Sequence, residues 1–323
     1  SLRQWGVLDL GGNPVGFNSF NGSGVVTNGA AGAATFIVGN NAGSGTWTGA
    51  FQDGVGVLNV VKTGTAGQNW HGVSTHTGFT RIGGSALVDV QVMADIGQPS
   101  GLGAGSAGAN AASLVFDGTT GGLNYAGSAR ILALTFGSAS VSTDRLFTLA
   151  GAGATLSSTV SNGNAIVWRN PGDIAFGVVG PQTLVLTGTS TGDNALFPRL
   201  TDSGTGADLT AVTKTGTGVW VLGNFANAYS GITTVGNGTL VLAAAGALPA
   251  SSPLVLGNAA TAGIVQAEGS FVRSLAATAV AGVESVTWAG TAGGGFAAAG
   301  SSLVVALGGV GSPTALTWGQ GSF

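Results

Sequence analysis

One stretch of the sequence occurs twice, and this self-similarity limits the possible folds more than any other feature. Residues 211–242 contain two apolar runs, Val219–Leu222 and Leu240–Leu242, with the shorter run Ile232–Val235 between them. Glycine or asparagine borders each run, which is typical of short β-strands joined by turns. None of the runs has the 3.6-residue apolar period of a helix.

A second and more divergent copy occupies residues 60–90. Its segment Lys62–Thr65 is identical to Lys214–Thr217, and Ile82–Val88 aligns with Val235–Val241 after one inserted residue. A unit of strands and turns that recurs within one chain predicts a repeat architecture, in which stacked units bury a shared core.

The better copy resembles a known repeat. The residues that carry the likeness are Lys214–Gly218, Trp220–Leu222, Asn227–Val235 and Gly238–Leu242. They are similar to the passenger-associated transport repeat, the autotransporter-associated β-strand repeat of very large bacterial surface proteins. The copy at 60–90 departs from this pattern, because Gln68–His71 replaces the apolar run, while 183–202 and 286–323 resemble the flanks of such repeats. The resemblance implies a right-handed parallel β-helix that is exported and displayed, and it implies no chemistry, because the repeat and not a site defines the group.

The composition suits a long sheet surface with few charges. Only 7% of the 323 residues are charged, against about 25% in ordinary domains, yet 44% are hydrophobic, which argues against a disordered chain. The longest nearly apolar run, Leu240–Leu248, is far shorter than the ~20 residues of a membrane-spanning helix, so no transmembrane segment is expected. Without cysteine there are no disulfides. With a net charge of −3 the chain lacks the excess of positive charge that nucleic-acid binding needs, and so small a charge opposes self-association only weakly.

We therefore expect residues 1–323 to form a single continuous all-β structure, a right-handed parallel β-helix (β-solenoid). At about 20–25 residues per coil it would have roughly 13–16 coils. The Gly/Ala-rich segment 91–112 has few strand signals and is expected to be an excursion from the coil. No segment is long enough for a stable isolated helix. Two β-sandwich domains are the rival architecture; we prefer the solenoid because the self-match lies inside one unbroken pattern.

The sequence predicts no catalytic, cofactor-binding or metal-ligating residues. His71 and His76 are five positions apart, whereas a helical zinc motif needs a spacing of four with a glutamate beside it, so we interpret them as solvated turn residues. No Gly-rich stretch leads into a helix, so none can cradle a phosphate. We expect neither a cofactor nor a metal.

The twelve acidic residues are scattered singly along the chain. Asp193, Asp202 and Asp208 lie in turns, where aspartate usually caps the backbone. Asp89 and Asp95 would come together only if the coil register allows it. An enzyme that acts on polysaccharides needs at least two carboxylates on one groove.

Seven tryptophans are spread along the chain, at positions 5, 47, 70, 168, 220, 288 and 318. Packing in the core or at corners is the first interpretation. The alternative is a row of exposed rings that grip sugars.

The leading functional hypothesis is a secreted structural β-solenoid, the building block of a bacterial extracellular fibre or surface assembly. Strand-like runs near both ends, without charged or proline-rich caps, predict end-to-end or lateral association with copies of itself. One alternative is an adhesin or autotransporter passenger segment that binds glycans or surfaces, and another is a polysaccharide-active β-helix enzyme. We expect no enzyme activity and a location outside the cell or on its surface, with the chain itself and cell-surface glycans as partners.

Overall fold

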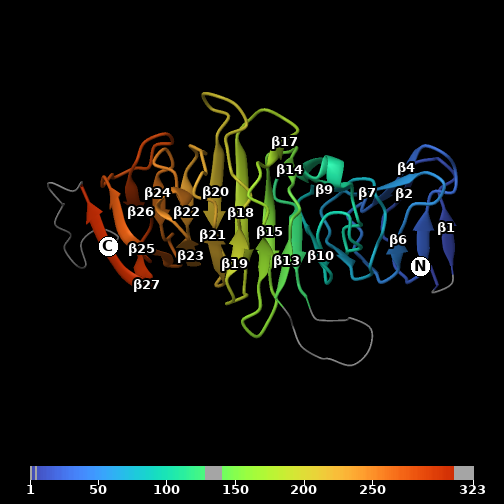
Figure 1. The fold of residues 1–323 in the computed structure, drawn as a ribbon, viewed down its shortest axis with the longest axis horizontal. Helices are drawn as coiled ribbons and strands as arrows, with labels where there is room; N and C mark the ends of the chain where they lie inside the picture. Colours follow the sequence, from blue (N-terminus) through green and yellow to red (C-terminus); the bar gives the residue numbers. More distant parts are fainter. Residues whose placement is uncertain (1, 4–5, 128–139, 309–323) are drawn as a thin grey trace. The chain divides into compact units, whose positions relative to one another are not determined.

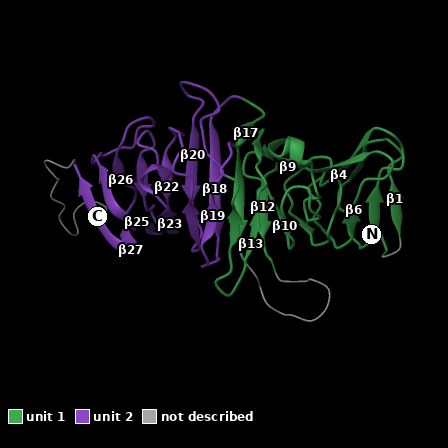
Figure 2. Ribbon diagram, viewed as in Figure 1, with its two compact units in different colours: residues 1–170, 174–178 green, residues 171–173, 179–323 purple. Residues whose placement is uncertain are grey.

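Short β-strands make up almost all of the regular structure in this chain. The computed structural model describes residues 2–3, 6–127 and 140–308. The chain divides into two compact units, unit 1 with residues 1–170 and 174–178 and unit 2 with residues 171–173 and 179–323 (Figure 2). The helical elements of the described residues are three single turns of 3₁₀ helix, η1 (Ala107–Ala109), η2 (Ala111–Ser113) and η3 (Ala245–Ala247). The all-β prediction is confirmed. The apolar runs 131–136 and 316–318, which the sequence also predicts to be strands, lie outside the described residues.

The strands of unit 1 stack in parallel ladders, in which each strand lies over the one from the preceding coil (Figure 1). The first ladder is β2 (Val15–Phe17), β4 (Ala33–Val38), β7 (Val57–Lys62), β9 (Thr80–Gly84), β11 (Leu114–Gly118), β14 (Thr148–Leu149) and β17 (Ala175–Phe176). The second is β5 (Gly45–Trp47), β8 (Gln68–Trp70), β10 (Leu87–Val90), β12 (Gly122–Tyr125) and β15 (Gly153–Ser158). Shorter ladders join β1 (Val7–Asp9), β3 (Val25–Thr27) and β6 (Ala50–Phe51), and also β13 (Val141–Thr143) and β16 (Ile166–Trp168).

Unit 2 repeats this arrangement with two parallel ladders. One consists of β18 (Gln182–Gly188), β20 (Thr210–Lys214), β22 (Thr233–Val235), β24 (Leu254–Leu256) and β26 (Val286–Trp288). The other consists of β19 (Asn194–Leu196), β21 (Val219–Leu222), β23 (Gly238–Leu242), β25 (Gly263–Arg273) and β27 (Gly294–Leu307). Parallel stacking of successive coils is the arrangement of a β-solenoid, as the sequence predicts.

The core follows from the two-residue period of the strands. Along β18 and β20 every second side chain is buried, because successive side chains of a strand point to opposite faces. Inward residues of successive coils then form a ladder without exposed surface: Leu184, Val212, Thr233, Leu254 and Val286. Full burial of each aliphatic member stabilises the fold by about 1.5–3 kcal/mol.

The number of residues per coil varies over a wider range than the expected 20–25. Val212 lies beside Thr233, 21 positions on, whereas Val88 lies beside Leu123, 35 positions on. The longer coil includes residues 91–113, which leave the ladder between β10 and β11 and contain η1 and η2. We call this segment the excursion. A single solenoid over residues 1–323 stays a prediction. None of the helices among the described residues has the length and apolarity needed to cross a membrane.

Candidate functional site

Both lysines of the sequence are buried at matching corners, one in each unit. Lys62 ends β7 and Lys214 ends β20, and neither side chain has any exposed surface. The Lys214 Nζ donates to the carbonyl oxygens of Thr215 at 2.7 Å, Gly216 at 2.8 Å and Asn237 at 3.0 Å. The Lys62 Nζ donates to Gly64, Gly83 and Ala86 at 3.0–3.1 Å. Each ammonium thus gives its three protons to three carbonyls from two adjacent coils.

Glycine makes these corners possible. Gly64 and Gly84 have φ of +69° and +79°, a region that suits glycine, and a Cβ on Gly84 would lie 1.8 Å from the Gly64 oxygen. The tight turns point carbonyls inward, where water cannot satisfy them. Burial lowers the pKa of both lysines to about 8, so both remain protonated at neutral pH. The Lys-Thr-Gly pattern that marks the repeat is therefore a structural device.

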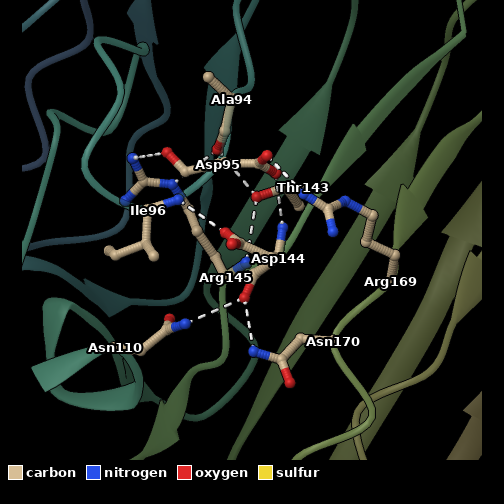
Figure 3. A network of polar contacts seen from close by, with 9 residues as sticks. All are labelled: Ala94, Asp95, Ile96, Asn110, Thr143, Asp144, Arg145, Arg169 and Asn170. Carbon is tan, nitrogen blue, oxygen red and sulfur yellow. Dashed lines mark hydrogen bonds and ion pairs between the residues drawn. The ribbon is translucent and has the colours of Figure 1, made fainter. Parts of the chain in front are cut away.

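A buried arginine holds the excursion in place (Figure 3). Arg145 follows β13 and is only 1% exposed. Its Nε donates to Ala94 O at 3.0 Å, and its Nη2 lies 2.6 Å from Gly103 O and 3.0 Å from Ala104 O. The Nη1 atom is buried without a hydrogen-bond partner. Sequence reasoning missed this residue, because its partners are backbone atoms more than 40 positions away.

Two aspartates form a clasp beside this arginine (Figure 3). The Asp95 Oδ1 accepts from the Asp144 amide at 3.0 Å, and the Asp144 Oδ1 accepts from the Ile96 amide at 2.7 Å. Asp95 also forms an ion pair with Arg169 at 2.5 Å. The coil register brings Asp95 together with Asp144 rather than with Asp89. Both carboxylates thus help to fix the segment.

Asp202 caps a turn, as its position in the sequence predicts. Its Oδ1 accepts from the amides of Thr210 at 2.7 Å and Ser230 at 3.0 Å, so it ties one coil to the next. Among the described residues no three histidine, aspartate or glutamate side chains come together as metal ligands.

The prediction that both histidines are solvated is wrong for His76. This side chain is 1% exposed, and burial lowers its pKa to about 4, with a further contribution from the positive charge of Arg145. Its Nε2 lies 3.0 Å from the Thr80 hydroxyl, which donates to Leu102 O at 2.8 Å. The Nε2 must therefore carry the proton, and the Nδ1 is buried without a partner. The excursion covers this ring, which is why sequence spacing alone could not predict its burial.

The tryptophans do not form an exposed row. Trp47, Trp70, Trp168 and Trp220 are at most 3% exposed, and Trp288 is half-buried. In unit 1 the rings pack on phenylalanines, with Phe20 and Trp47 centroids 4.7 Å apart. Core packing is thus confirmed for the four buried rings. Trp5 and Trp318 lie outside the described residues.

Comparisons with known proteins agree with the repeat seen in the sequence. Residues 212–242 match the family model of the passenger-associated transport repeat. The chain is similar to a protein of Brucella suis biovar 1 (strain 1330) named "Adhesin BmaC autotransporter", with 37% identity over 218 residues, or 66% of this chain. The chain spans about 6% of the length of that relative. No solved structure matches.

Proposed function

Because the chain carries a passenger-associated transport repeat at 212–242, we propose that it is a segment of the passenger of a bacterial surface adhesin. Its place is outside the cell, on the bacterial surface, where its stacked coils hold contact surfaces away from the membrane. The observation that carries this proposal is the coincidence of the matched repeat with the Lys214 corner, which recurs at Lys62.

The way in which charges are used supports a structural role. Lys62, Lys214, Arg145 and Arg273 are all buried and donate to backbone carbonyls. Asp95, Asp144 and Asp202 accept from backbone amides, so they too hold segments together. Because these charged side chains are hydrogen-bonded to the backbone of the same chain, few charged groups are left for acid–base chemistry. We propose that the chain is not an enzyme.

Two measurements test this function. Antibody against the purified chain should label intact cells of the source bacterium in immunoelectron microscopy, and labelling only after permeabilisation would contradict surface display. Latex beads coated with the folded chain should bind epithelial monolayers above the level of albumin-coated beads. Binding no higher than that of albumin-coated beads would contradict the adhesive function.

Self-association into fibres is a finer proposal. In the part of the chain that the structure describes, β27 pairs only with β25, and Val304 on β27 is 61% exposed. A strand with a free edge can pair with a further coil or with another copy. Negative-stain electron microscopy of the purified chain at neutral pH shows whether copies of the chain stack on one another. Unbranched filaments support stacking of copies, and single short rods contradict it.

A further inference from the structure

Unit 2 contains a hollow that none of its structural roles explains. It has a volume of about 360 Å³ and lies between the segment 242–250 and the outer part of β25. The segment 242–250 contributes an apolar wall with Ala243–Ala245, and the wall formed by β25 carries Glu268 and Arg273 beside Phe271, with Glu284 also in the lining. The volume lies within the roughly 300–1,000 Å³ of small-molecule sites, and a few polar groups opposite an apolar wall are the usual composition of such sites.

Arg273 is the fixed point of the polar wall. Its side chain is 5% exposed, and its Nη atoms donate to the carbonyls of Ser252, Leu248 and Pro249 at 2.7–3.0 Å. These bonds hold the guanidinium rigidly against the segment that forms the opposite wall. Among the described residues its Nε has no hydrogen-bond acceptor in reach, because the Glu284 Oε1 is 3.9 Å away.

Glu284 is held in place while its carboxylate stays accessible. The Ser274 hydroxyl donates to its backbone carbonyl, and its side chain is 49% exposed. Glu268, also exposed, adds a second carboxylate to the lining. The hollow thus combines one donor, the Nε of the largely buried Arg273 side chain, with carboxylates that can only accept.

This arrangement selects the chemical class of the ligand. A separation of 3.9 Å is too long for a direct hydrogen bond, but it fits one oxygen that accepts from Nε and donates to Oε1 at about 2.7–3.0 Å. A hydroxyl group does both, whereas an ammonium only donates and a carboxylate only accepts. Anionic ligands are further disfavoured, because two glutamates face one arginine in the lining.

We propose that this hollow binds a neutral pyranose of a cell-surface glycan, with a ring hydroxyl between Arg273 and Glu284 and the apolar ring face against Ala243–Ala245. The inference rests on the proposed adhesive function and gives it a ligand class. It also places sugar contact away from Trp47, Trp70, Trp168 and Trp220, whose burial removes these four rings from that role.

Titration of the purified chain with monosaccharides, followed by saturation-transfer difference NMR, tests the site. We expect saturable millimolar binding of galactose or N-acetylglucosamine and at least ~10-fold weaker binding of N-acetylneuraminic acid, since one hydrogen bond to a charged group changes affinity by about that factor. Absence of saturable binding by both neutral sugars would overturn the proposal, as would preference for the acidic sugar.

Single substitutions in the hollow and elsewhere in unit 2 test whether the sugar binds in the hollow. Glu284→Ala removes the acceptor and Ala244→Phe fills the hollow from its exposed wall, and each should weaken binding at least ~10-fold. Asp193→Asn, an exposed acidic residue elsewhere in unit 2, is the matched control and should bind as the unaltered chain does. Thermal unfolding confirms that each variant is folded. Equal binding by all three variants excludes the hollow, whereas the bead assay reports adhesion independently of it.

Discussion

Lys214 at a regular corner of unit 2 and Arg145 beneath the excursion of unit 1 are both buried cations that donate to backbone carbonyls. The corner brings three carbonyls together from two adjacent turns, and a compact ammonium with three protons matches them. The excursion spreads its carbonyls from Ala94 to Ala104, and only a planar guanidinium reaches both ends. The comparison shows that the geometry of the turn determines which cation the fold requires.

The strongest test of this comparison is Arg145→Lys. The shorter ammonium cannot reach both Ala94 and Ala104, so buried carbonyls lose their partners. We expect a loss of about 3–5 kcal/mol in the free energy of unfolding, measured in urea, as for other broken buried charge networks. Hydrogen exchange should accelerate mainly within 94–105.

Arg169→Lys is the control for that substitution, because Arg169 forms a partly exposed ion pair with the same clasp. Its effect should stay below about 1 kcal/mol. A loss for Arg145→Lys no larger than this would mean that either cation suffices under the excursion.

Acid should destabilise the fold through His76, which lies under the excursion. The folded-state pKa of His76 is about 4, below its ordinary value of 6.5, so the unfolded chain takes up a proton first as the pH falls. The contribution of neutral His76 to the free energy of unfolding is therefore fully present above pH 6.5. It is lost progressively down to about pH 4, by an amount on the order of 3 kcal/mol. Urea unfolding at several pH values measures this, and His76→Gln should remove the His76 part of the slope.

Asp53 and Arg145 are the charged groups that act on His76, and acid also acts on other parts of the chain. The informative quantity is the difference between the unaltered chain and His76→Gln. A difference that does not change with pH between 7 and 4 would show that His76 protonates without disturbing the fold.

The two lysine corners should respond alike to Lys62→Met and Lys214→Met. Methionine fills the space of the stem but leaves three carbonyls unsatisfied, while it also removes a costly buried charge. We expect each variant to lose about 2 kcal/mol in urea unfolding. Thr213→Met, at the outward-facing neighbour of Lys214, is the control. Values that differ by several kcal/mol between the two corners would break the equivalence that the sequence repeat implies.

The smallest effect is expected at the surface ion pair of unit 2. Arg199 and Asp173 are 3.2 Å apart, but their side chains are 36% and 60% exposed. Asp173→Asn should change the free energy of unfolding by less than about 0.5 kcal/mol, and less still in high salt. A larger loss would show that exposed charges also hold this fold, which would weaken the contrast with the buried cations.

The sequence predicts the strands and their stacking because these depend on local signals. Short β-favouring runs such as Val219–Leu222 and glycines at the corner are visible without any structure, and the second Lys-Thr-Gly copy indicates a repeat. That Asp202 lies in a turn and bonds to backbone is predictable for the same reason, whereas its bond to the Ser230 amide of the next coil is not. The burial of Lys62 and Lys214 is harder to predict, because a lysine next to a turn is ordinarily solvated.

By itself the sequence determined the all-β class and the repeat, both of which arise from interactions between near neighbours and successive coils. Only the tertiary structure decided which polar groups are buried. His76 and Arg145 are 69 positions apart, yet the excursion covers both, and Arg273 on β25 donates to the carbonyls of Leu248 and Pro249 more than 20 positions away. Such contacts depend on where an irregular loop returns, and no local pattern specifies that position.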